Sequence, residues 1–174
     1  MRVQVIESGF QEPLATTITV VQALPKGDRS KEAIELLTEA GVDRIVPWAA
    51  SRSIGKGTDK FAITAREASK QTRRNRIPFV MGVLDAAKIA AEIPNYDLVI
   101  VLHEGAQRKF TEVIKSGSQK VLVIIGPEGG LTDEEVALFS KAGAQVALLG
   151  RPIFRSAHAG MAALSGLNAA LRIW

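Results

Sequence analysis

Residues 121–130, with the sequence VLVIIGPEGG, constrain the fold of this chain more than any other segment. The first five are apolar and mostly β-branched, which predicts a strand buried on both faces, as in a parallel sheet. This strand runs directly into a glycine-rich loop, and glycine permits a positive φ and the close approach of a ligand, as we expect at Gly129 and Gly130. Thr132 and Glu135 have the spacing of a capping box that begins a helix. We therefore expect a strand, a ligand-binding loop and a helix in succession.

Residues 126–130, the glycine loop, lack two features of common phosphate sites. No Lys follows the glycines as in a P-loop, and their spacing is not GxGxxG. Amides at the start of the next helix still suit a phosphate, and a tight turn without a ligand is the plain alternative. The loop alone leaves a cofactor site, a nucleotide site and a simple turn open.

The composition excludes several classes of protein. With 174 residues, of which 47% are apolar, the chain can bury the core of one main domain. The sequence has no membrane-length apolar run and no signal-peptide layout at its N-terminus, so we expect a cytoplasmic protein without membrane contact. The absence of cysteine excludes disulfides, thiolate zinc sites and thiol nucleophiles, and His103 and His158 are too few for most metal sites. We expect no metal.

Positive charge is concentrated in residues 51–80, the basic stretch. This segment carries eight Lys and Arg residues against two Asp and Glu residues, whereas the whole chain has a net charge of only +4. Concentrated positive charge suits a polyanion, because each phosphate contact releases counterions. The basic stretch predicts a nucleic-acid surface, with a solvated helix face as the alternative.

Strand and helix patterns alternate along the chain, which predicts an α/β fold with helices on both faces of a parallel sheet. We expect helices at residues 29–40, 61–73, 86–92, 107–115, 132–142 and 155–173. Strands are expected at residues 2–6, 17–23, 44–47, 97–102, 121–125 and 145–149. The first strand is separated from the others by a linker, residues 7–15, so it is expected to belong to a different unit.

Six motifs occur in the order and spacing of one family, and they cover residues 17–174. They are LPKGD (24–28), ELLTEAGVDRIVP (35–47), AREASKQTRR (65–74), LHEGA (102–106), IGPEGGLTDEE (125–135) and LLGRPIFRSAHAG (148–160). The chain resembles the RsmE family of ribosomal RNA uridine-N3 methyltransferases, which belong to the SPOUT superfamily. IGPEGG before a Thr-x-x-Glu helix is typical of knotted methyltransferases, and LPKGD with AREASKQ is typical of this branch.

The resemblance implies a fold, a reaction and an assembly. It implies a SPOUT-type parallel sheet flanked by helices, with a deep trefoil knot near the C-terminus, in a domain covering residues 16–174. Residues 1–15 would be the remnant of an N-terminal PUA-like barrel and its linker. The implied activity is N3-methylation of a uridine in small-subunit (16S) ribosomal RNA by a homodimer, with S-adenosylmethionine as the cofactor.

The cofactor implied by the resemblance carries no phosphate, so its site needs backbone groups and close glycine contacts rather than a Lys. The glycine loop meets this need. Carried over from the family, the cofactor-binding residues are Leu102, His103, Glu104, Gly105, Gly126, Pro127, Glu128, Gly129, Gly130, Leu149, Gly150, Ile153 and Phe154. Two roles stay open: Glu128 accepts from a ribose hydroxyl or a backbone amide, or caps the next helix, and His103 is in the shell or is a loop residue without chemistry.

Arg155 is the expected catalytic residue. Methylation at uridine N3 removes an imide proton, and a guanidinium can stabilise the negative charge that develops on the uracil oxygens. A structural Arg at a dimer interface is the alternative. Relatives often have Thr-Glu-Thr-Ala after this Arg, whereas this chain has Ser-Ala-His-Ala at 156–159. His158 is either a proton acceptor or an exposed capping residue, so the general base stays unassigned.

The basic stretch holds the expected RNA contacts. Glu67, Gln71 and Arg74 share one helical face by their spacing, and the resemblance implies that this face lies toward the substrate. The complete set of expected RNA-binding residues is Arg66, Glu67, Lys70, Gln71, Arg73, Arg74 and Arg76. Two other functions stay open: a catalytically weak RNA-binding relative, and a different nucleotide-binding α/β domain.

Overall fold

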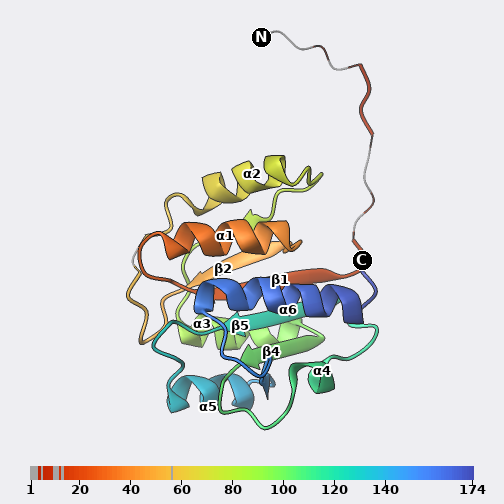
Figure 1. Cartoon of the computed structure of the whole chain (residues 1–174). Helices are drawn as coiled ribbons and strands as arrows, with labels where there is room; N and C mark the ends of the chain where they lie inside the picture. Colours follow the sequence, from red (N-terminus) through yellow and green to blue (C-terminus); the bar gives the residue numbers. More distant parts are fainter. Residues whose placement is uncertain (1–3, 5, 10–11, 13, 56) are drawn as a thin grey trace.

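Six parallel strands form one sheet in the computed structural model, in the order β3-β2-β1-β5-β4-β6 (Figure 1). The structure describes residues 4, 6–9, 12, 14–55 and 57–174. The strands are β1 (Thr17–Ala23), β2 (Arg44–Trp48), β3 (Phe79–Val80), β4 (Leu98–Leu102), β5 (Lys120–Ile125) and β6 (Gln145–Ala147). At the centre, β1 and β5 pair from Thr17 opposite Lys120 to Gln22 opposite Ile125.

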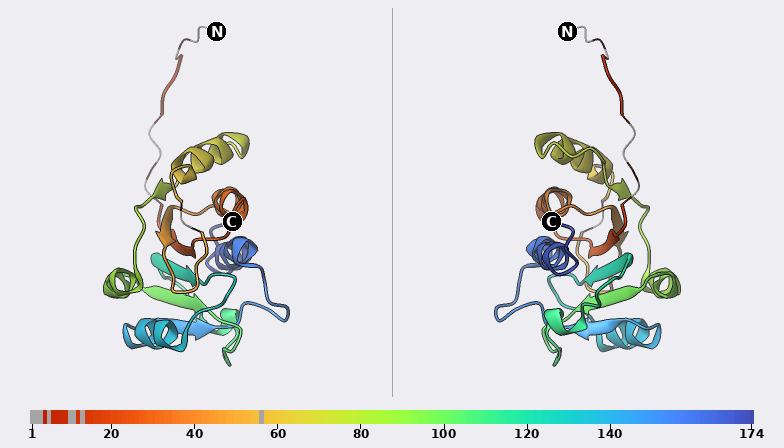
Figure 2. Two further views of the ribbon diagram at one scale, coloured as in Figure 1. Left: turned by 90° about the vertical axis from the view of Figure 1, so that its left-hand side faces the viewer. Right: turned by 90° about the vertical axis from the view of Figure 1, so that its right-hand side faces the viewer.

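Helices cover both faces of this sheet, as Figure 2 shows edge-on. One face carries α1 (Arg29–Glu39), α2 (Phe61–Gln71), the short α4 (Phe110–Val113) and α6 (Ser156–Ala170). The other face carries α3 (Ala86–Glu92), the 3-10 turn η1 (Ile93–Asn95) and α5 (Asp133–Lys141). Among the described residues, none of these helices has the length and apolar character needed to cross a lipid bilayer.

The central strands are buried on both faces, because successive side chains point to opposite sides of a strand and helices cover both sides of the sheet. In β5, Val121, Val123 and Ile125 pack under α1 and α6. Leu122 and Ile124 pack on the other side with α3 and α5, where Trp48 and Phe139 meet edge to face, with ring centroids 5.4 Å apart. The prediction of a doubly buried strand before the glycine loop is confirmed.

Most predicted elements are present, with differences at their ends. The helix expected at 107–115 is reduced to α4, because Lys109 and Ile114 have extended backbones at its two ends. The two residues of β3 and the turn η1 are too short for a periodic pattern, and neither was predicted. Of the strand expected over 2–6, residues 2, 3 and 5 lie outside the described part of the chain.

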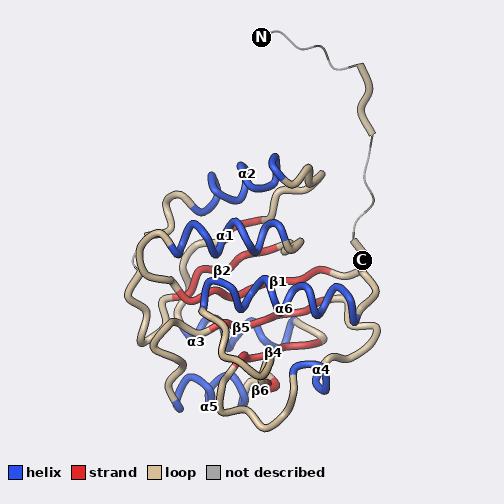
Figure 3. Tube along the Cα trace, in the orientation of Figure 1, coloured by secondary structure: helices blue, strands red, loops and turns tan. Residues whose placement is uncertain are grey.

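The order of the strands reverses between β1 and β5. From β1 the chain continues to β2 on one side, whereas β5 is followed by β6 on the other side of the sheet. In open parallel sheets, ligands bind beyond the carboxyl ends of the strands at such a reversal. Figure 3 shows that long loops follow the carboxyl ends of β2, β5 and β6.

Candidate active site

A cavity of about 470 Å³ opens beyond the carboxyl ends of β4 and β5, beside the reversal in strand order. Its walls come from four parts of the chain: Arg29 at the start of α1, residues 102–104 at the end of β4, residues 125–131 except Gly129, and residues 148–150, 152–156 and 159 around the start of α6. Leu102, Ile125 and Leu131 make much of this wall apolar. The cavity therefore has the position and lining of a small-molecule site.

The structure brings together most of the residues expected to bind the cofactor. Eleven of those thirteen residues line the cavity, as does Arg155, whereas Gly105 and Gly129 do not. Gly105 contributes indirectly, since its N–H donates to Nδ1 of His103 at 3.0 Å. The lining residues that sequence reasoning missed are Arg29, Ile125, Leu131, Leu148, Pro152, Ser156 and Ala159. Arg29 directly follows the LPKGD motif, which was the available signal for it.

Positive φ in the glycine loop occurs at Gly130, where φ is 74°, and not at Gly129. The N–H of Gly130 donates to the carbonyl of Pro127 at 3.0 Å, which closes the turn. A Cβ on Gly129 would lie 3.2 Å from Cβ of Arg52. The expected positive φ is therefore confirmed at Gly130 and wrong at Gly129, where the absence of a side chain makes room for Arg52.

Residues 50–55 hold the glycine loop from outside. Arg52 donates through Nη1 to the carbonyls of Gly129, at 3.0 Å, and Leu131, at 3.4 Å. The N–H of Ser51 donates to Oε1 of Glu135 at 2.8 Å, and the other carboxylate oxygen of Glu135 accepts from the N–H of Thr132. The predicted capping box is thus confirmed, and it also anchors the segment after β2.

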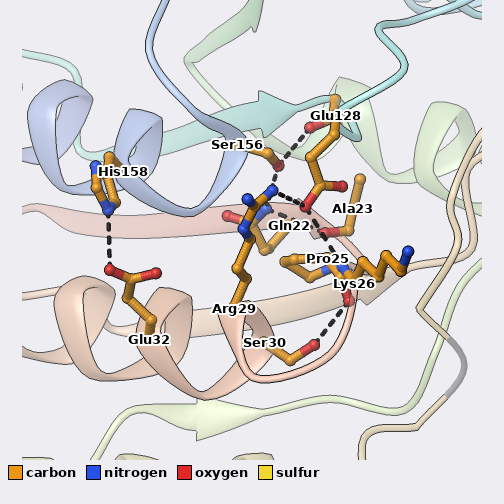
Figure 4. A network of polar contacts seen from close by, with 11 residues as sticks. Gln22, Ala23, Pro25, Lys26, Arg29, Ser30, Glu32, Glu128, Ser156 and His158 are labelled. Atoms are coloured by element: carbon orange, nitrogen blue, oxygen red, sulfur yellow. Dashed lines mark hydrogen bonds and ion pairs between the residues drawn. The ribbon is translucent and has the colours of Figure 1, made fainter.

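A buried hydrogen-bond relay joins β1, the glycine loop and α6 (Figure 4). Gln22, fully buried in β1, donates through Nε2 to the Ser156 hydroxyl at 3.1 Å. The Ser156 hydroxyl in turn donates to the carbonyl of Gly126 at 2.7 Å. Because Gly126 and Ser156 both line the cavity, the relay determines how two of its walls are placed.

Glu128 faces α1 rather than the helix that follows the glycine loop. Its Oε1 accepts from the N–H of Lys26 at 3.4 Å and lies 3.7 Å from Nη1 of Arg29. The cap of α5 is supplied instead by Thr132. The capping interpretation of Glu128 was therefore wrong, and its carboxylate joins the cavity wall to the loop after β1 (Figure 4).

Arg155 precedes α6, and its exposed side chain lines the cavity. Within the described part of the chain, this guanidinium has no hydrogen-bond or ion-pair partner. His158, one turn further along, pairs through Nε2 with Oε1 of Glu32 at 3.0 Å and is 40% exposed. His158 does not line the cavity.

Comparisons with known proteins agree with this geometry. The sequence profile of the RNA methyltransferase domain family matches residues 12–168. Ribosomal RNA small subunit methyltransferase E of Mycobacterium bovis is 34% identical over 186 residues, which cover 100% of this chain and 71% of that protein. This chain belongs to the ribosomal RNA small subunit methyltransferase E family.

Solved structures of similar proteins include two with a bound ligand. A putative methyltransferase of Legionella pneumophila in complex with the cofactor SAM superposes with a TM-score of 0.83 at 29% identity, over 90% of this chain and 67% of that one. Ribosomal RNA small subunit methyltransferase E of Neisseria gonorrhoeae, bound to S-adenosyl methionine, gives a TM-score of 0.81 at 25% identity, over 88% and 66%. The family's parallel sheet is therefore shared by this chain.

In this methyltransferase domain the helical face expected for RNA is shorter than predicted. Helix α2 ends at Gln71, and Arg73 has a left-handed backbone with φ at 55°, so Arg74 does not continue the face of Glu67 and Gln71. Glu67 pairs instead with Lys70, at 2.6 Å between Oε1 and Nζ. Arg66, Glu67, Lys70 and Gln71 remain exposed on α2.

Arg74 is half-buried at the end of α1. It donates through Nη1 to the carbonyl of Thr38 at 2.7 Å and through Nη2 to that of Val42 at 2.8 Å. Burial raises the pKa of the nearby Asp43, although the N–H of Ile18 and the charge of Arg74 oppose this shift. The Arg74 side chain, which was expected to bind RNA, thus forms hydrogen bonds within its own domain.

The last arginines of the basic stretch lie away from the cavity. Helix α2 connects two parallel strands, so it begins at the carboxyl edge of the sheet and ends at the amino edge, as Figure 1 shows. Arg73, Arg74 and Arg76 follow its end, and the guanidinium of Arg76 donates to the carbonyl of Glu12. The cavity lies at the opposite edge.

Proposed function

We propose that this chain methylates N3 of a uridine in small-subunit (16S) ribosomal RNA, with S-adenosylmethionine as the methyl donor. One observation carries the proposal: the loops after β4, β5 and β6 line a single cavity at the strand-order reversal. Relatives with the same sheet bind this cofactor in their solved structures. The catalytic and cofactor-binding residues named above are part of the proposal.

The groups around the cavity suit S-adenosylmethionine better than a nucleotide triphosphate. Leu102, Ile125 and Leu131 offer apolar contacts for an adenine ring, and the glycine loop offers backbone groups. Glu104 and Glu128 add two carboxylates, which can attract the positive sulfonium of the cofactor. Among the described residues, the lining has two arginines, Arg29 and Arg155, which balance these carboxylates and leave no excess of positive charge for a triphosphate.

For this reaction, the chain must orient the uracil base and stabilise the negative charge that develops on it. Bound S-adenosylmethionine supplies an electrophilic methyl group on a sulfonium centre. As the N3 proton passes to solvent water, negative charge spreads onto O2 and O4 of the uracil, where the guanidinium of Arg155 stabilises it before N3 takes the methyl group. Positioning of the base against the cavity supplies much of the remaining acceleration. His158 pairs with Glu32 and does not line the cavity, so the general base stays unassigned.

The active form is proposed to be a homodimer with a C-terminal trefoil knot. Ile153, 77% exposed, and Phe154, 40% exposed, line the cavity mouth, and Met161 is exposed on α6. A second copy covering these residues would close the cavity. Sedimentation of Met161→Glu, expected to be monomeric, tests the dimer, and Leu138→Glu on α5 is the control. The knot is proposed from the motifs at 125–135 and 148–160, which resemble those of knotted methyltransferases.

Two measurements test the proposed function. Calorimetry should detect S-adenosylmethionine binding and no comparable binding of ATP, and the reverse result would favour a nucleotide-binding domain. Incubation with 16S ribosomal RNA and the cofactor should then produce 3-methyluridine, identified by mass spectrometry of the digested nucleosides. Cofactor and RNA binding without methyl transfer would overturn the enzymatic proposal in favour of an RNA-binding relative.

A further inference from the structure

Within the described part of the chain, the cavity is lined by two Lys or Arg side chains, Arg29 and Arg155, which come from different elements. Arg29 is the first residue of α1, and its side chain is 51% exposed. Figure 4 shows it extending from α1 toward Glu128 and the start of α6. The proposed chemistry employs Arg155 and leaves Arg29 without a role.

The interaction between Arg29 and Glu128 is too loose to explain the position of this guanidinium. The closest N–O distance is 3.7 Å, longer than a hydrogen bond, and exposed ion pairs contribute little to stability. Glu128 also has a second partner, the N–H of Lys26. A guanidinium held loosely at the rim of a cavity remains available to another anion.

The exposure of Arg29 favours an anion that lies outside the cavity. A cofactor enclosed in the cavity contacts its inner walls, whereas RNA crosses its mouth and carries a phosphate at every nucleotide. Lys26 is also exposed beside Arg29, which adds positive charge on this side. The arginines at 73, 74 and 76, expected to bind RNA, lie at the opposite edge of the sheet.

We propose that Arg29 binds a backbone phosphate of the RNA next to the target nucleotide and so positions the uracil at the cavity mouth. This inference rests on the proposed function. Guanidinium groups bind phosphate through two parallel N–H donors, and phosphate contacts determine register without reading sequence. Arg29 is thus a positioning residue and Arg155 the catalytic one.

The test compares Arg29→Ala and Arg29→Lys with Lys31→Ala in the full chain. Lys31 is an exposed cation on the same helix, paired with Glu35 and absent from the cavity lining. RNA affinity is measured at several salt concentrations with a 16S ribosomal RNA fragment, and cofactor affinity is measured by calorimetry. Methyl-transfer kinetics give the KM for RNA and kcat separately.

For Arg29→Ala, the plot of log affinity against log salt should become less steep by about 0.7 to 0.9, the loss of one phosphate contact. The KM for RNA should rise about tenfold, since a charged contact contributes roughly 1.4 kcal/mol. Cofactor affinity and kcat should stay within about twofold of wild type, since Arg29 positions RNA and does not touch the reacting atoms. Arg29→Lys should keep the salt dependence, and Lys31→Ala should match wild type.

Two results would overturn the inference while leaving the proposed function intact. An unchanged salt dependence in Arg29→Ala would mean that this guanidinium contacts no phosphate. A large loss of cofactor affinity in the same variant would assign Arg29 to the cofactor or to the glycine loop through Glu128. If the wild-type chain itself transfers no methyl group to RNA, the proposed function falls and this inference falls with it.

Discussion

The Ser156 hydroxyl donates a 2.7 Å hydrogen bond to the carbonyl of Gly126, which joins the start of α6 to the first residue of the glycine loop. These two residues are 30 positions apart in the sequence. The same hydroxyl accepts from Gln22, so its orientation is determined by a buried side chain of the central sheet. The arrangement of the cavity walls therefore depends on one hydroxyl group.

Ser156→Ala should weaken cofactor binding. The substitution leaves the Gly126 carbonyl without its donor, at a cost of about 1 kcal/mol or more, so affinity for S-adenosylmethionine should fall about five- to tenfold in calorimetry. Thr38→Ala is the control, because that buried hydroxyl bonds only within α1. A Ser156→Ala protein with wild-type affinity would show that the relay does not position the cavity.

Arg52→Ala should also weaken cofactor binding, although Arg52 does not line the cavity. The variant removes the donor to Gly129 and Leu131 and frees the glycine loop. Gly129→Val should have a similar effect by displacing Arg52. The double variant should then bind about as well as either single variant, because both act through one contact. Additive losses in calorimetry would mean that Gly129 acts independently of Arg52.

Arg155→Ala should lower the rate of methyl transfer by about two to three orders of magnitude, as the loss of one preorganised donor typically does. Cofactor affinity and the dimer should stay near wild type, because the interaction is made mainly in the transition state. Single-turnover kinetics, calorimetry and sedimentation measure the three quantities. Loss of the dimer or of cofactor binding in Arg155→Ala would reassign this residue to a structural role.

Arg74→Ala should destabilise the fold without changing RNA binding. Its two charged hydrogen bonds to the end of α1 are half-buried, so the free energy of unfolding in urea should fall by about 2 to 3 kcal/mol. Arg73→Ala, at an exposed neighbour, should cost much less. A flattened salt dependence of RNA binding in Arg74→Ala would instead support the RNA contact expected from the sequence.

Asp97→Asn should alter how stability depends on pH. The N–H groups of Lys120 and Gln119 donate to the Asp97 carboxylate and lower its pKa below the ordinary value of 3.8. A lowered pKa stabilises the fold above 3.8, and this contribution is lost as the pH falls through the folded-state pKa. The difference in unfolding free energy between wild type and Asp97→Asn should therefore shrink in acid. A pH-independent difference would contradict this.

Short sequence patterns correctly predicted the features that depend only on residues close together in the chain. The capping box of Thr132 and Glu135 is present, because its two residues are three positions apart and need no distant partner. The helical face of Glu67, Gln71 and Arg74 was predicted wrongly, because the helix ends before its last member. Helix ends depend on the packing of the following residues, which here includes the contact of Arg74 with α1.

The sequence by itself determined the parallel sheet, the glycine loop and most of the cavity residues, because these follow from short-range periodicity and contiguous motifs. Only the tertiary structure decided the roles of Arg29, Arg52 and Arg74. Arg29 lies at the rim of the cavity, Arg52 lies behind the glycine loop, and Arg74 lies against the end of α1. The physical reason is that every arginine carries the same guanidinium group, whatever its position in the sequence. Its function depends on which carbonyl, carboxylate or phosphate a distant segment brings within reach.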